Sequence, residues 1–267
     1  MAYSAGMKST LTVIFFLWAT GADSAYSADR KDILAVPHLE IEGESEPRDH
    51  RISLEQGVEL VERYQERHPG AIQAALFDRV IFDDILAQPE SAGLRMYNAE
   101  KTNGETTLVV VGVDARNHDL LQEKFLGDHG WPCPPACSPA GSLGSSSLAD
   151  GEGAASHVES SRPRRLEING EKRDHRISLE QGFALIERHR KQHPGSIQSF
   201  TFDRSIFADI LAQPGCVGVR MYYAQEADGA PTLVLAGINA QGKDLNILGD
   251  DAVRCPSTCP DPPSDPE

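Results

Sequence analysis

The sequence predicts an α+β protein, in which two tandem copies of a small unit each pack two helices on a short antiparallel sheet, in the order α-β-α-β-β. Two observations lead to this prediction. The first is a repeat: DHRISLEQGVELVERYQERHPGAIQ at Asp49 returns as DHRISLEQGFALIERHRKQHPGSIQ at Asp174, and the match continues without a gap to Leu120 and Leu245. More than half of the aligned positions are identical, which indicates a duplicated unit. The second observation is the order of helix and strand patterns inside each copy.

Each copy opens with the signal for a helix. Ser53 and Gln56, repeated as Ser178 and Gln181, fit a capping box, in which the N-cap hydroxyl and the third helical residue satisfy each other's backbone donors. Apolar residues then recur at helical spacing until the Pro-Gly pairs at 69–70 and 194–195 end both runs. These apolar residues are Leu54, Val58, Val61 and Tyr64 in the first copy and Leu179, Phe183 and Ile186 in the second.

A short strand, a second helix and a hairpin follow the first helix. IQAALF and IQSFTF are strand candidates that end at Asp78 and Asp203, and each aspartate suits the N-cap of the helix RVIFDDILAQ or RSIFADILAQ. The next two apolar stretches of each copy flank Asn103-Gly104 or Asp228-Gly229. Such dipeptides favour a tight turn, so these stretches are predicted to form an antiparallel pair.

The two ends of the chain and the segment between the copies are predicted to lie outside the repeated units. The apolar run from Leu11 to Ala22 follows Lys8 and precedes small residues, which predicts a signal peptide over residues 1–28; the alternative is an uncleaved anchor helix. We expect repeat modules at 38–138 and 164–260, a flexible Gly/Ser-rich linker at 139–163 and a Pro-rich tail at 261–267. The protein is therefore expected to be exported to the periplasm or the extracellular space, with no stable membrane span after cleavage.

Composition and motifs exclude several classes of function. The chain has 267 residues, 40% of them hydrophobic and 24% charged, as in an ordinary globular protein. Its formal net charge of −15 argues against a nucleic-acid partner, because binding to phosphates depends on clustered Lys and Arg. The sequence has no Gly-rich phosphate loop after a strand, no H-E-x-x-H helix, no G-x-S-x-G elbow and no Cys-x-x-Cys beside a βαβ pattern.

Four motifs together carry a resemblance to other proteins. FDRxIFxxILAQP, GxRMY and TLVxxG, followed by a CPxxC-type stretch, occur in both copies. This set resembles a group of uncharacterised bacterial proteins whose unit ends in a similar Cys-Pro-Pro-x-Cys stretch. The resemblance covers nearly all of both copies and implies a real bacterial module, and it implies no activity.

Two kinds of polar residue recur in both copies as candidate ligand-binding groups. One kind is the Arg and Tyr of the RMY motif, in which the arginine holds a carboxylate or phosphate of a small anionic ligand. The structural alternative is that these arginines project from the polar face of the sheet toward a helix carboxylate such as Asp84 or Asp209. The residues of this candidate patch are Arg95, Tyr97, Arg220 and Tyr222.

The other kind is histidine. His68 and His193 stand at the ends of the first helices, and His50 and His175 stand just before those helices begin. One of them acts as a base or ligand in the functional interpretation. In the structural interpretation, the late-helix histidines complement the helix dipole and cap its carbonyl groups.

The paired cysteines have two interpretations. In an exported protein, we expect local disulfides in CPPAC and CPSTC, with Cys216 left as a free thiol. The alternative is zinc, held by His129, Cys133 and Cys137 with His50 or His68 as the fourth ligand. Asp251 stands in the second copy where His129 stands in the first, which disfavours zinc. The predicted disulfides join Cys133 to Cys137 and Cys255 to Cys259.

The sequence therefore favours an exported, non-catalytic binding or structural module without a cofactor, duplicated for bivalent interaction with an unknown protein or a small anionic ligand. The alternative is a metal-dependent, zinc-containing or hydrolytic enzyme that uses the His, Arg and Cys residues of each copy.

Overall fold

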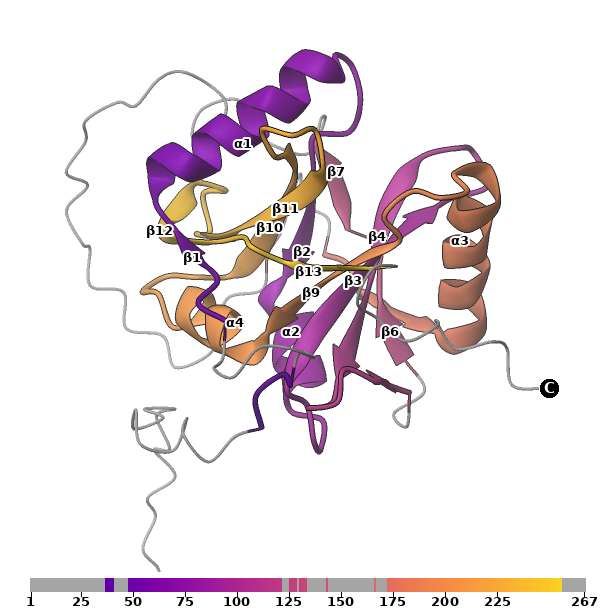
Figure 1. Cartoon of the computed structure of the whole chain (residues 1–267). Helices are drawn as coiled ribbons and strands as arrows, with labels where there is room; N and C mark the ends of the chain where they lie inside the picture. Colours follow the sequence, from indigo (N-terminus) through magenta and orange to yellow (C-terminus); the bar gives the residue numbers. More distant parts are fainter. Residues whose placement is uncertain are drawn as a thin grey trace, which may run out of the picture. The chain divides into compact units, whose positions relative to one another are not determined.

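Local signals in each copy produce nearly the same run of elements (Figure 1). The computed structural model describes residues 37–40, 48–121, 125–128, 130–133, 143, 166 and 172–255, which belong to one compact unit. Residues 49–133 are called copy 1 and residues 174–255 copy 2. The predicted signal peptide and tail lie outside the described residues, as does the predicted linker except for Leu143, which is buried.

Copy 1 contains two helices and seven strands in its described part. They are β1 (Arg51–Ile52), α1 (Leu54–Arg67), β2 (Ala74–Asp78), α2 (Arg79–Leu86), β3 (Gly93–Glu100), β4 (Thr106–Val113), β5 (Asp119–Leu120), β6 (Phe125–Gly127) and β7 (Trp131–Cys133). Copy 2 repeats the pattern with β8 (Arg176–Ser178), α3 (Leu179–Gln192), β9 (Ser199–Asp203), α4 (Arg204–Leu211), β10 (Gly218–Gln225), β11 (Pro231–Ile238), β12 (Asp244–Gly249) and β13 (Val253–Cys255).

The helix ends form as the capping signals predict. Ser53 accepts a hydrogen bond from the backbone N–H of Gln56 at 3.1 Å, and the Gln56 side chain accepts one from the Ser53 N–H at 2.9 Å. Ser178 and Gln181 repeat this capping box in α3. The side chain of Asp78 caps α2. Capping therefore fixes where these helices begin.

The strands assemble into two antiparallel sheets, and each sheet mixes strands of both copies. Sheet A has six strands in the order β1-β12-β11-β10-β2-β7. Sheet B has seven, with the order β13-β9-β3-β4-β6-β8 and β5 paired to β4. In sheet A, β2 of copy 1 pairs with β10 of copy 2, and in sheet B, β9 of copy 2 pairs with β3 of copy 1. The two junctions have the same register, since Gly218 faces Asp78 and Gly93 faces Asp203.

This exchange corrects the predicted fold class. The prediction of two separate α+β units, each with its own short sheet, is wrong. The described residues are mostly sheet, with two large sheets shared by the copies and four helices. Strands β2 (AALFD) and β9 (SFTFD) have the same length and both end in Phe-Asp, so the local strand pattern does not select the hairpin with which each one pairs. In the structure, α2 and α4 carry the chain from one sheet to the other.

Each long helix covers strands of the other copy. Helix α1 packs on β10, β11 and β12 of copy 2, whereas α3 packs on β3, β4 and β6 of copy 1 (Figure 1). Helix α3 also contacts β8, the short strand of its own copy that directly precedes it. Gly57 lets α1 approach closely, because a Cβ at this position would lie 2.8 Å from Leu248 Cδ1. Leu54, predicted to belong to the apolar face of α1, is instead 45% exposed.

The main core lies between the two sheets and includes α2 and α4. Phe82 of α2 stacks on Phe207 of α4, with ring centroids 5.8 Å apart, at the centre of a cluster to which β2, β3, β9 and β10 all contribute. Two smaller apolar clusters fill the outer faces, one between α1 and sheet A and one between α3 and sheet B. Strand β2, which lies between β10 and β7 in sheet A, is buried along its whole length for this reason.

Candidate functional site

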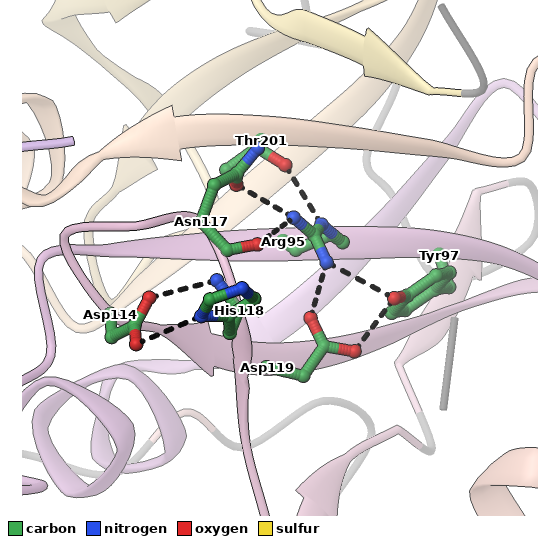
Figure 2. Close-up of polar contacts among 7 residues, drawn as sticks. All are labelled: Arg95, Tyr97, Asp114, Asn117, His118, Asp119 and Thr201. Carbon is green, nitrogen blue, oxygen red and sulfur yellow. Dashed lines mark hydrogen bonds and ion pairs between the residues drawn. The ribbon is translucent and has the colours of Figure 1, made fainter. Parts of the chain in front are cut away.

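The RMY arginine of copy 1 lies at the centre of a buried polar cluster (Figure 2). Arg95 projects from β3, and its side chain is 1% exposed. It forms an ion pair with Asp119, at 2.5 Å, from the segment that follows β4. The Tyr97 hydroxyl donates to the other carboxylate oxygen of Asp119 at 2.6 Å. We call Arg95, Tyr97, Asn117, Asp119 and Thr201 the Arg95 cluster.

Every N–H of the Arg95 guanidinium has an acceptor inside the protein. A guanidinium has five N–H donors. Nε donates to Thr201 Oγ1, and Nη1 donates to the Tyr97 hydroxyl and to Asp119. Nη2 donates to both the backbone and the side-chain oxygen of Asn117, at 2.8 and 2.6 Å. This arginine therefore retains no donor for an outside carboxylate or phosphate.

The ligand-binding interpretation of the RMY motif requires exposed arginines, and the structure buries both of them. Both are 1% exposed, because the β4–β5 and β11–β12 loops cover them on the outer faces of the sheets. Their expected carboxylate partners, Asp84 and Asp209, form ion pairs with Arg176 and Arg51 instead. The structure thus assigns the RMY motif a role in pinning a loop to its sheet.

Copy 2 repeats the ion pair with fewer hydrogen bonds. Arg220 pairs with Asp244 at 2.5 Å, and it donates to the Tyr222 hydroxyl and to the backbone oxygen of Gly242. Leu76 occupies the register position of Thr201, and Gly242 the sequence position of Asn117, so two side-chain acceptors are missing. Nε of Arg220 has no acceptor among the described residues. We call Arg220, Tyr222, Gly242 and Asp244 the Arg220 cluster.

Burial controls the ionisation of both clusters. Desolvation raises the pKa of Tyr97 well above its usual value, and the charge of Asp119 adds to the shift. Burial and the charge of Asp244 raise the pKa of Tyr222 in the same way. Burial also raises the pKa of Asp119, while the Arg95 guanidinium opposes that rise. Each tyrosine consequently stays protonated near neutral pH and donates to its aspartate.

Sequence reasoning missed the carboxylates that complete these clusters. Asp119 and Asp244 stand at equivalent positions of the two copies, and each lies 24 residues after its arginine. The repeated aspartate was the available signal. Asn117 has a positive φ of 66°, where Gly242 has 75°, so a shared left-handed turn positions the loop in both copies.

The exposed rim beside the Arg95 cluster differs between the copies. His118 is exposed, and its Nδ1 lies 3.3 Å from Asp114 Oδ2 (Figure 2). Asp114 also accepts the backbone N–H of His118 at 2.8 Å, as expected for an aspartate that closes a turn. Copy 2 has Asn239 and Lys243 at these positions. The His–Asp pair is therefore a feature of one turn and is not shared by the duplicated unit.

The late-helix histidines lie at the C-caps of the long helices. His68 and His193 are exposed, and the backbone N–H of each donates to a carbonyl four residues earlier. His193 Nε2 lies 3.4 Å from Glu100 Oε2. Among the described residues, no hydrogen bond or ion pair joins either histidine to an RMY arginine, so the predicted ligand-binding residues do not form one group.

The early histidines are buried at the junction between the copies. His50 of copy 1 contacts Asp203 and Asp250 of copy 2, and His175 of copy 2 contacts Asp78 and Asp128 of copy 1. Each binds backbone atoms through both ring nitrogens, in an arrangement suited to joining segments rather than to catalysis.

The cysteines are partly outside the described residues. Cys133 and Cys255 lie on β7 and β13, in different sheets, and both are disulfide-bonded. Cys137 and Cys259, their predicted partners, lie outside the described residues, so the local pairing stays a prediction. Cys216 is a free, buried thiol, as predicted.

Two of the predicted zinc ligands, His129 and Cys137, lie outside the residues that the structure describes. In the described part of the chain, no three His, Cys, Asp or Glu side chains are arranged to hold a metal ion.

No protein-family model, curated protein or solved structure matches this chain. The resemblance to bacterial proteins with a Cys-Pro-Pro-x-Cys ending stays a prediction. Among the helices of the described residues, none has both the length and the apolar character required to cross a bilayer.

Proposed function

We propose that this chain is an exported, non-catalytic binding protein whose two copies present two related helix faces for bivalent interaction. The observation that carries the proposal is the divergence of α1 and α3 on their outer sides. Their sheet-facing residues stay alike, with Gly57 matching Gly182 and Val61 matching Ile186, all four buried. Their outward residues differ, with exposed Glu66 of α1 matching exposed Lys191 of α3.

The divergence changes the charge of the two faces. Helix α1 carries four glutamates and two arginines, a net charge of −2, whereas α3 carries two glutamates, two arginines and a lysine, a net charge of +1. Electrostatic complementarity governs partner choice and the rate of association more than it governs fold. The two faces accordingly suit two different partner surfaces, a basic one at α1 and an acidic one at α3.

Bivalent binding also agrees with the saturation of the Arg95 cluster. The repeated RMY motif is used internally, so a partner meets the unit at its exposed helices. Because both helices belong to one compact unit, they present their faces together without a flexible spacer.

The test reverses the charge of one exposed residue on one helix face at a time. Full-length protein and the variants Glu66→Lys and Lys191→Glu are used as baits against the envelope and medium of the source cells, and captured proteins are quantified by mass spectrometry. We expect Glu66→Lys to lose a basic partner and Lys191→Glu to lose an acidic one, while circular dichroism stays that of the wild type.

If both variants capture the same proteins in the same amounts as the wild type, the proposal is contradicted. Stoichiometric zinc in the purified protein favours the metal-dependent enzyme instead.

A further inference from the structure

Two histidines at equivalent positions connect the copies to each other. His50 is 2% exposed and His175 is 3% exposed. His50 Nε2 lies 3.1 Å from the backbone nitrogen of Asp203, and His175 Nε2 lies 3.1 Å from that of Asp78. Asp203 and Asp78 are the N-caps of α4 and α2, the helices that carry the chain between the sheets. Each copy therefore places a buried imidazole at the start of the other copy's connecting helix.

The hydrogen-bond partners determine the protonation state of both rings. His50 Nδ1 lies 3.0 Å from the backbone oxygen of Asp250, and His175 Nδ1 lies 3.0 Å from that of Asp128. A carbonyl oxygen only accepts, so Nδ1 carries the proton. A backbone N–H only donates, so Nε2 must offer its lone pair to Asp203 or Asp78. Both imidazoles are thus neutral in the folded chain.

A second proton at Nε2 is incompatible with this arrangement. It would place one N–H against another at 3.1 Å and remove the acceptor of a buried backbone donor. We propose that His50 and His175 form a paired acid-sensitive lock, which holds the copies in their exchanged arrangement at neutral pH and releases both junctions together when the pH falls.

The charged groups near each ring are mixed, and burial dominates at His50. Desolvation lowers the pKa of His50. The hydrogen bond to the backbone of Asp250 and the charges of Asp203 and Asp251 oppose this shift, while Arg48 reinforces it. The rings of Phe202 and, at the other junction, of Phe77 and Trp131 pack against the imidazoles and exclude water. Among the described residues, the charged or titratable groups around His175 are those of Asp78, Asp84, Asp128, Arg173, Asp174 and Arg176.

The sign of the effect follows from proton linkage. A histidine that is neutral when folded and has its usual pKa of about 6.5 when unfolded binds a proton on unfolding, so stability is lost as the pH falls below about 6.5. Two such histidines raise the unfolding equilibrium constant by up to about 100-fold per pH unit in that window, against up to about 10-fold for one. Two coupled histidines are therefore recognised by the steepness with which the unfolding equilibrium constant changes with pH.

The experiment compares the full chain with His50→Gln, His175→Gln and the double variant by urea unfolding between pH 7.5 and 5. Glutamine keeps an acceptor oxygen near the position of Nε2 and does not titrate. His118→Gln is the matched control, because His118 is exposed. Comparing variants with the wild type at each pH cancels the contributions of carboxyl groups that do not interact with the two imidazoles.

We expect each single variant to reduce the change of the unfolding equilibrium constant by up to about 10-fold per pH unit, and the double variant to reduce it by up to about 100-fold per pH unit. The control variant should leave this pH dependence unchanged. A double variant with the acid dependence of the wild type overturns the proposal.

A second measurement avoids the risk that a variant fails to fold. Long-range ¹H–¹⁵N spectra of the wild-type imidazoles report which nitrogen carries the proton. We expect both rings to show a protonated Nδ1 and to stay neutral until the folded signals disappear. Titration of either ring near pH 6.5 in a chain that remains folded overturns the proposal.

Discussion

Replacing Arg95 by glutamine tests whether the RMY motif is structural. The substitution removes the cation from a pair in which Arg95 is 1% and Asp119 5% exposed. Among the described side chains, only the Tyr97 hydroxyl then still donates to the buried carboxylate. Breaking a buried ion pair by removing one partner typically costs about 3–5 kcal/mol of unfolding free energy. In a unit of this size, that loss lowers the Tm by roughly 6–20 °C.

The matched substitution Arg220→Gln is expected to cost less. Arg95 makes five hydrogen bonds, whereas Arg220 makes three in the described structure. The two additional bonds, to Thr201 and to the Asn117 side chain, make Arg95→Gln more damaging by about 1–3 kcal/mol. Adding Asp119→Asn to Arg95→Gln should restore part of the loss, because it removes the uncompensated charge.

Urea unfolding monitored by tryptophan fluorescence and circular dichroism measures these differences, with linear extrapolation to water. The reasoning is refuted if Arg95→Gln costs less than about 1 kcal/mol, since an exposed arginine behaves in that way. It is also refuted if Arg220→Gln is as damaging as Arg95→Gln.

Three further predictions test the exchanged fold and one buried carboxyl group. Protease cleavage between residues 144 and 162 should leave two fragments that co-elute in size-exclusion chromatography under reducing, native conditions, because both sheets contain strands of each copy; fragments that separate speak against the exchange. Gly93→Ala should cost about 1–3 kcal/mol or more in urea unfolding, because its Cβ would lie 2.3 Å from the backbone oxygen of Phe202, and unchanged stability contradicts that close approach. Burial raises the pKa of Asp250 to about 6, so its protonated form stabilises the fold at low pH and this contribution is lost as the pH rises from about 4 to about 6. The stability of wild type relative to Asp250→Asn should therefore be greater at pH 5 than at pH 7, and an equal difference at both pH values excludes the shift.

Some features of this protein follow from short-range sequence signals. Ser53 with Gln56 and Ser178 with Gln181 form the capping boxes that their spacing predicts. The hairpins form at the predicted places, with positive φ at Gly104 in one loop and at Gly229 in the other. Capping and turn geometry involve residues close in the chain, so a single sequence contains them.

The candidate site was only half predictable. The RMY motif identifies Arg95 and Tyr97 as special, yet an arginine on a strand is ordinarily placed toward solvent. Its burial depends on Asn117 and Asp119 in a later loop and on Thr201 in the other copy. Contacts at such separations are set by the packing of the sheets, which the pattern around residue 95 does not contain.

The sequence by itself determined the duplication, the helix ends and three strands of each copy, β2, β3 and β4 in copy 1 and β9, β10 and β11 in copy 2, but not the other strands of either sheet. Only the tertiary structure decided which strand pairs with which. Ala74–Asp78 and Ser199–Asp203 have the same length, and their registers with the two hairpins are equivalent, so the local strand pattern does not distinguish pairing within a copy from pairing between copies. The choice between them depends on the burial of Phe82 against Phe207 and of each long helix on the other copy's strands, and these contacts exist only when the whole chain is assembled.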